Sequence, residues 1–202
     1  MSKKAVFYVV FFLVLSLGFY FSLKAVVPGF FKKRVPVISR VQPFSFTTQD
    51  GQTFTRENMK GKVAIANFFF TTCTSVCPRM NNNLRPAYEA FKNNPDVLLL
   101  SFTSDPQRDS AATLKRYADS MQVNTSKWVF LTGKKDSLYQ AARHSFKIDD
   151  PINFVEGDAV DFLHTQFIAL VNKKGEVIKI YDGLKPSELK SIEQDVNNLL
   201  KD

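Results

Sequence analysis

Two patterns of hydrophobic positions divide the chain. Residues 5–23 form an unbroken uncharged run without a polar face, and it is long enough to cross a membrane as a helix. From residue 44 onward, apolar positions either cluster in short runs or recur every three to four residues, as they do in a folded α/β domain. We therefore expect a membrane anchor over residues 1–24, an extended tether over 25–43 and a folded domain over 44–202. A cleaved signal peptide is the alternative for the first segment, but the run ends at Leu23-Lys24 without a small-x-small cleavage site.

The folded domain alternates predicted strands and helices. Runs 62–70 and 96–103 are mostly apolar and rich in β-branched, leucine and aromatic residues, which is typical of strands buried on both faces. Further expected elements are a hairpin near 44–52, helices over 78–91, 110–121 and 135–144, a strand over 128–131, a hairpin over 165–181 and a closing helix over 186–200. Pro86 should kink or split the first helix, and residues 147–163 fit no element. This order indicates an α/β fold with a mixed sheet and is compatible with a thioredoxin-like fold.

Charge and cysteine content exclude several classes of protein. The net charge is +8, but residues 1–40 carry seven basic residues and no acidic one, so the rest of the chain is close to neutral. A nucleic-acid-binding surface is therefore not indicated. The chain has only two cysteines, which excludes a disulfide-stapled scaffold and a metal module built on four cysteines.

Both cysteines lie in one short segment that follows the first buried strand. Cys73 and Cys77 are four residues apart at the expected start of a helix, a spacing that puts both thiols on one helix face. Exposed backbone amides at a helix N-terminus stabilise thiolates, and Pro78 is well tolerated in a first turn. Two such thiolates can bind a thiophilic metal or form a reversible disulfide. Two buried structural cysteines are the plainer alternative.

A third ligand would distinguish metal binding from thiol redox chemistry alone. The chain has two histidines, and His144 is expected on the surface of a helix. His164 stands at the entry to the strand expected over 165–171, where a structural role and a ligand role both remain open. Met80, three residues after Cys77, is expected in the core, because methionine on an apolar helix face usually packs there. Asp105 before Pro106 is expected to form an ordinary turn, and Asp109 or Ser110 is expected to cap the next helix.

Five markers in order along the chain resemble the Sco/SenC family of copper-binding proteins, which assist assembly of the CuA site of cytochrome c oxidase. These markers are Gly61-Lys62, Cys73-x-x-x-Cys77-Pro78, the segment SDPQRD at 104–109, the segment WVFLTG at 128–133, and His164-Thr165. The resemblance covers roughly residues 44–200. The sequence departs from the family in one visible place, since Thr74 stands where the family often has proline.

The resemblance implies a thioredoxin-like domain that binds copper through Cys73, Cys77 and His164. Two sulfurs and one imidazole suit Cu(I), and the same set also accepts Cu(II). The resemblance further implies a cytoplasmic N-terminus and a domain outside the membrane, although Lys32, Lys33 and Arg34 follow the span and charge counting alone does not favour this orientation. No Arg- and Ser-rich transit segment precedes the span, so we expect a bacterial inner-membrane protein with a periplasmic domain.

Two functions compete for the same cysteines. The first is a copper chaperone that delivers copper to the CuA-bearing subunit of cytochrome c oxidase or to another copper protein. The second is a thiol-disulfide oxidoreductase that reduces the cysteines of an apo-copper site through a redox disulfide between Cys73 and Cys77. A peroxiredoxin-like peroxidase is disfavoured, because the motif supplies no environment that would activate a peroxide. His164 separates the first two functions, since dithiol exchange does not need it.

Overall fold

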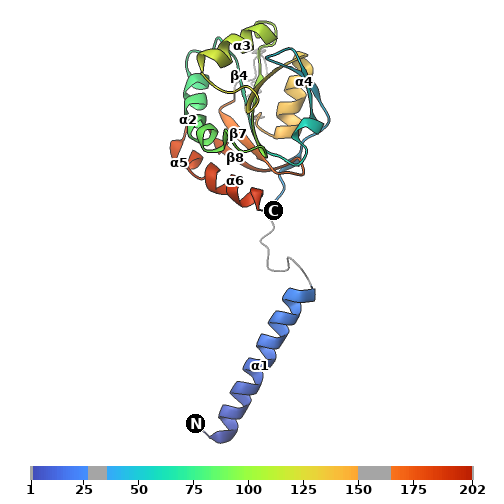
Figure 1. The fold of residues 1–202 in the computed structure, drawn as a ribbon, viewed down its shortest axis with the longest axis vertical. Helices are drawn as coiled ribbons and strands as arrows, with labels where there is room; N and C mark the ends of the chain where they lie inside the picture. The colour runs from blue at the N-terminus through green and yellow to red at the C-terminus, as the bar shows by residue number, and fades with distance from the viewer. Residues whose placement is uncertain (1, 27–35, 150–164, 202) are drawn as a thin grey trace, which may run out of the picture. The chain divides into compact units, whose positions relative to one another are not determined.

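A computed structural model describes residues 2–26, 36–149 and 165–201, and it divides the chain into two units, residues 1–36 and 37–202. The first unit contains helix α1 (Lys3–Val26), which has no buried residue (Figure 1). Its most apolar window has a mean hydropathy of 2.3, so α1 has the length and composition of a membrane span, properties that a signal sequence shares. The apolar helix expected over 5–23 is therefore present.

The second unit is built on one mixed sheet of eight strands, in the order β1-β8-β7-β4-β5-β6-β2-β3. Strands β4 (Val63–Phe69), β5 (Val97–Thr103) and β6 (Trp128–Thr132) run parallel at its centre. The flanking strands pair antiparallel: β1 (Ser39–Arg40), β2 (Ser45–Thr48), β3 (Thr53–Thr55), β7 (Phe167–Val171) and β8 (Glu176–Asp182). The predicted mixed α/β sheet is confirmed.

Helices cover both faces of the sheet, which explains why the central strands are apolar on both sides. Val63, Ile65 and Phe69 of β4 pack on one face against helices α2 (Val76–Phe91), α3 (Ala111–Ser120), α5 (Pro186–Leu189) and α6 (Ile192–Leu200). Ala64 and Phe68 point to the other face, which is covered by the 3-10 turn η1 (Arg56–Met59), helix α4 (Lys135–Gln140) and the π-helical segment η2 (Ala141–Phe146). Every residue of β4 and β5 is buried, as predicted.

Two expected helices differ in detail from the structure. Helix α2 runs without a break through Pro86, which the sequence predicts to kink or split it. Pro86 cannot donate a hydrogen bond to the carbonyl of Asn82, but both residues are exposed, so water can satisfy that carbonyl. The closing helix is divided into α5 and α6, because the Ser191 hydroxyl donates to the Glu188 carbonyl over 2.8 Å and ends the first piece.

The folded unit begins before residue 44. Strand β1 pairs with β8, with Ser39 opposite Val177 and Arg40 opposite Glu176, and the side chain of Val41 is buried. Residues 37–43, which the sequence pattern assigns to the tether, therefore belong to the folded unit, and residues 39–40 form the edge strand of its sheet. Two residues of strand are too few to show an alternating pattern, so the sequence carries no signal for β1.

Candidate metal centre

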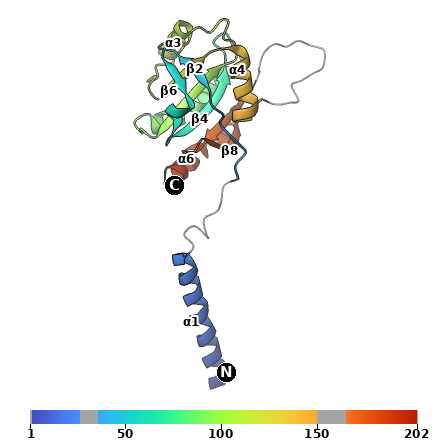
Figure 2. The ribbon, with the colours of Figure 1, turned by 90° about the vertical axis from the view of Figure 1, so that its right-hand side faces the viewer.

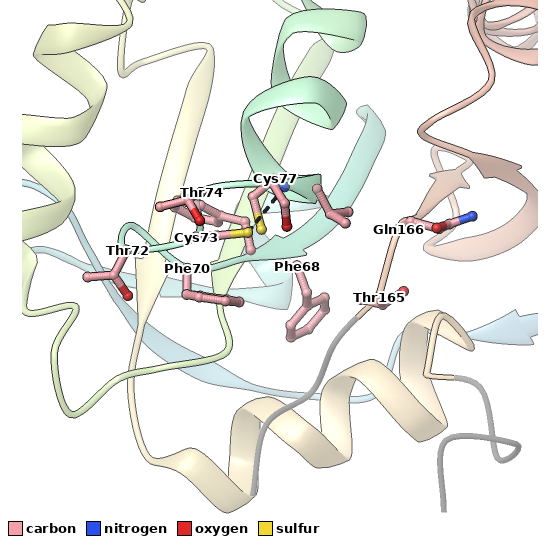
Figure 3. Close-up of a pocket in the computed structure, with 11 residues that line it drawn as sticks. Phe68, Phe70, Thr72, Cys73, Thr74, Cys77, Thr165 and Gln166 are labelled. Carbon is pink, nitrogen blue, oxygen red and sulfur yellow. Dashed lines mark hydrogen bonds between the residues drawn. The ribbon is translucent and has the colours of Figure 1, made fainter. Parts of the chain in front are cut away.

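Cys73 and Cys77 meet at the carboxyl end of the central strand. After β4 the chain makes a short loop, in which the Cys73 N–H donates to the Phe70 carbonyl over 3.2 Å. Helix α2 begins at Val76, so Cys77 lies in its first turn. The Cys77 N–H lies 3.4 Å from the Cys73 sulfur and donates to it (Figure 3). The predicted approach of the two thiols is confirmed, and both are free thiols in the structure.

The two thiols differ in burial and in acidity. Cys73 is partly exposed, whereas Cys77 is only 5% exposed. Burial would raise the pKa of Cys73, but hydrogen bonds from the Cys77 thiol and from backbone amides at the start of α2 hold it below its ordinary value. Burial, and then the hydrogen bond to Cys73, raise the pKa of Cys77 to about 12. The pair therefore carries its first negative charge on the accessible sulfur.

A cavity of about 260 Å³ opens beside the cysteines. Residues 68–70 and 72–77 form one part of its lining, and Thr165 and Gln166, which precede β7, form the other. Figure 3 shows the two sulfur atoms next to each other near the rings of Phe68 and Phe70, with Thr165 and Gln166 across the cavity. Two segments that are far apart in the sequence thus meet here because β4 and β7 pair antiparallel, with Asn67 opposite Ile168.

His164 lies outside the described residues, so its predicted ligand role remains a prediction. Among residues 2–26, 36–149 and 165–201, no group of three or more His, Cys, Asp or Glu side chains is arranged to hold a metal ion. His144 is exposed on η2 and Met80 is fully buried in the core, and both findings confirm the sequence predictions. Residues 147–163, which fit no element by sequence, are described only up to Asp149.

A buried carboxylate holds the loop that carries Cys73. Asp109 is fully buried and accepts hydrogen bonds from the Thr71 N–H over 3.0 Å and from the Thr103 hydroxyl over 2.6 Å. The Thr71 hydroxyl also donates to it. The predicted capping role at this segment is fulfilled by Ser110, whose hydroxyl oxygen accepts from the Thr113 N–H. The role of Asp109 was missed, because its partners are 6 and 38 residues away along the chain.

A second buried network fixes α2 and α3 against the sheet behind the cysteines. The Asn67 amide, in the middle of β4, donates to Asn81 over 3.0 Å and accepts from Ser101 over 2.6 Å. Asn81 in turn donates to the Tyr117 hydroxyl over 2.9 Å. Burial raises the pKa of Tyr117 despite this hydrogen bond, and negative charge on Cys77 and Cys73 raises it further. The phenol is therefore electrostatically coupled to the thiols.

Comparison with known proteins identifies the family. The profile of the SCO1/SenC family matches residues 36–201. The chain belongs to the SCO1/SenC family. The SCO1 protein homolog of Bacillus subtilis is 33% identical over 165 residues, which are 81% of this chain and 84% of that protein.

Solved structures of this family share the fold. A SCO1/SenC family lipoprotein from Bacillus anthracis has a TM-score of 0.70 at 31% identity, over 82% of this chain and 98% of that one. BsSco, a member of the Sco family of cytochrome c oxidase assembly proteins with a disulfide switch, has a TM-score of 0.69 at 32% identity. The match covers 83% of this chain and 98% of that one. Arabidopsis thaliana ScoI with copper bound has a TM-score of 0.62 at 25% identity, over 81% and 99%. These similarities confirm the predicted thioredoxin-like fold of the Sco proteins.

The difference between the two thiols predicts selective alkylation. At pH near 8, iodoacetamide should modify Cys73 at least about tenfold faster than Cys77, because the thiolate is the nucleophile and Cys77 is buried and protonated. Peptide mass spectrometry after short exposure measures both rates. In guanidinium chloride the two rates should converge, and equal rates in the native protein would contradict the assigned asymmetry.

The Asp109 contacts predict a stability cost at one carboxylate. Asp109→Asn removes the charge that accepts three hydrogen bonds, so it should lower the free energy of unfolding by about 2–3 kcal/mol. Asp119→Asn is the matched control, because Asp119 is exposed and pairs with Lys115 at 3.5 Å, and its effect should stay below about 0.5 kcal/mol. Urea denaturation measures the free energy of unfolding of both variants. Equal losses of stability in Asp109→Asn and Asp119→Asn would contradict the role assigned to the buried carboxylate.

Proposed function

We propose that the chain binds one copper ion through Cys73, Cys77 and His164 and passes it to a copper protein. The observation that carries this proposal is the cavity lining: Thr165, the residue next to His164, lies across the same cavity as both thiols. An imidazole entering there would complete a set of two sulfurs and one nitrogen, which suits Cu(I) and also accepts Cu(II). The copper-bound Sco structures of Arabidopsis thaliana and yeast support copper as the cargo.

The recipient that we propose is the CuA-bearing subunit of cytochrome c oxidase. BsSco, at 32% identity, is a member of a family of cytochrome c oxidase assembly proteins. The partly exposed Cys73 sulfur gives an incoming ligand access to the metal, because a soft thiolate can exchange with another soft donor. Cys77, almost fully buried, would retain the copper until the exchange is complete.

We further propose that residues 1–24 anchor the protein in a bacterial inner membrane, with a short cytoplasmic N-terminus and the copper-binding domain in the periplasm. Helix α1 supplies a span of sufficient length and hydropathy. The lipoprotein from Bacillus anthracis supports attachment to a membrane. In this arrangement residues after 26 tether the domain, which folds from residue 37 onward.

Thiol-disulfide exchange is the second candidate function, and the asymmetry of the thiols favours it. The Cys73 thiolate would attack a disulfide of the partner, and Cys77 would then displace the partner by forming the Cys73–Cys77 disulfide. The pair loses two electrons and the partner's disulfide becomes two thiols, so the exchange balances. The disulfide switch of BsSco supports such a redox pair. The Cys73–Cys77 disulfide would also release copper, because metal binding needs thiolates.

The ligand proposal predicts different effects at sulfur and nitrogen. Cys73→Ala or Cys77→Ala should weaken Cu(I) binding by at least about 100-fold, since loss of an outer-shell partner alone costs 10–100-fold. His164→Ala should weaken Cu(I) less and remove the thiolate-to-Cu(II) charge-transfer absorption. Competition titration with a Cu(I) chelator and visible spectroscopy measure both. His144→Ala is the matched control, because His144 is exposed on η2. If His164→Ala keeps the wild-type Cu(I) affinity and Cu(II) spectrum, thiol-disulfide exchange becomes the leading function.

The topology predicts the activity of reporter fusions. Alkaline phosphatase fused after residue 36, where the folded unit begins, should be active, because the enzyme needs the oxidising periplasm. A fluorescent protein that folds only in the cytoplasm should stay dark at the same position. The reverse result for the two reporters would place the domain in the cytoplasm.

A further inference from the structure

The end of the folded unit remote from the cysteines carries a cluster of basic side chains. We call it the basic end, and it consists of Arg40, Arg56, Lys60, Lys62, Lys173 and Lys174. Its backbone segments meet: the Gly61 N–H donates to the Lys173 carbonyl over 3.2 Å, and the Val41 N–H donates to the Gly175 carbonyl over 2.9 Å. Strand β4 separates this end from the cysteines by seven residues, or about 20 Å.

The basic end keeps an excess of positive charge. Glu57 and Glu176 lie in the same region, and Arg40 pairs with Glu176 at 2.8 Å. Within the part of the chain that the structure describes, no carboxylate pairs with Lys60, Lys62, Lys173 or Lys174. Lys60 and Lys174 are exposed, and the Lys62 and Lys173 amino groups donate only to backbone carbonyls. Such a surface attracts an anionic partner.

Two exposed apolar residues lie where the chain enters the folded unit. Val37 and Ile38 are 47% and 45% exposed, and no other large apolar side chain is exposed in the described part of residues 36–201. The Ile38 N–H donates to the Val177 carbonyl over 2.8 Å, which fixes this pair beside β8, two residues before Arg40. Figure 2 shows the blue segment that enters the folded unit passing beside β8. Basic residues beside exposed apolar ones are the composition that a lipid interface accepts.

The short connection between α1 and the folded unit favours the lipid headgroups as the anionic partner. Ten residues, 27–36, join α1 to the folded unit, and even fully extended they span only about 35 Å. They include Lys32, Lys33 and Arg34, the basic cluster that the positive-inside rule does not explain on the outer side. Once α1 is in a bilayer, as the proposed function requires, the headgroups are the anionic surface held at high local concentration.

We propose that the basic end, together with Val37 and Ile38, docks on an anionic lipid surface. The lysines and arginines contact phosphate headgroups, and the two apolar side chains enter the interface. Because the cysteines lie at the opposite end of β4, this docking turns their cavity away from the lipid and toward a partner's exposed copper site.

Lysine labelling of the full chain in nanodiscs tests the docking. The discs contain phosphatidylcholine alone or phosphatidylcholine with phosphatidylglycerol, and a water-soluble acylating ester is followed by peptide mass spectrometry. Lys60 and Lys174 should react about fivefold more slowly in the anionic discs, the factor expected for one basic side chain near such a surface. High salt should abolish the difference. Lys190, the exposed residue directly after α5, is the internal control and should react equally in both discs.

Matched variants sharpen the result. Lys60→Glu with Lys174→Glu should abolish the lipid-dependent difference at Lys62 and Lys173, whereas Lys190→Glu, which makes the same charge change elsewhere, should preserve it. The double change Val37→Ser and Ile38→Ser should reduce the lipid-dependent difference in labelling without affecting folding, because both side chains are exposed. Equal labelling of Lys60 in both discs, or equal slowing at Lys190, would overturn the proposal. Slowing by soluble polyglutamate but not by anionic lipid would assign the surface to an acidic protein and overturn it too.

Two further readouts separate this inference from the proposed function. Retention of the chain on phosphatidylcholine discs tests the anchor, and a chain that is not retained refutes both the anchor and the docking. A retained chain with equal labelling refutes the docking alone. Cu(I) titration in the same discs tests the ligand set independently, since the basic end shares no residue with the cysteine cavity.

Discussion

The antiparallel pairing of β4 with β7 is the constraint on which the cysteine site depends. It places the residues that follow β4 beside the residues that precede β7, with Asn67 opposite Ile168. This register brings Cys73 and Thr165, which are far apart in the sequence, to the same cavity. Both strands are buried between two layers of side chains, so a shift by one residue would exchange the side chains of the two faces and disrupt the packing on both. The core therefore enforces the geometry that the chemistry needs.

Buried polar groups then hold the site in place within this frame. Asp109 ties the loop before Cys73 to the end of β5 through Thr71 and Thr103. Asn67 and Asn81 connect β4 to α2, whose first turn carries Cys77. Each of these groups is costly to bury without partners, so each one specifies a single arrangement of its neighbours. The accessible thiolate at Cys73 and the protected thiol at Cys77 follow from that arrangement.

Much of the fold and part of the site could be predicted from the sequence. The runs that became β4 and β5 are mostly apolar, which predicts strands buried on both faces. The four-residue spacing of Cys73 and Cys77 predicts that they lie close together, although only Cys77 lies in the first turn of α2 and Cys73 belongs to the preceding loop. Strand β1 and the hydrogen bonds that Asp109 accepts from Thr71 and Thr103 could not be predicted, because they are contacts between residues that are separated in the sequence. Pro86 shows a third limit, since exposure of the Asn82 carbonyl decides whether proline breaks a helix. The local sequence pattern therefore predicts the helices and strands, whereas contacts between distant residues determine where these elements end and which side chains hold them in place.

The proposed site holds one copper ion between two sulfurs and one imidazole. X-ray absorption at the copper edge of the Cu(I)-loaded chain measures this ligand set directly, with His164→Ala as the comparison. We expect two sulfur scatterers and one nitrogen in the wild type, with the imidazole multiple-scattering features lost in His164→Ala. Two sulfurs without an imidazole in the wild type, or an unchanged nitrogen shell in His164→Ala, would contradict it.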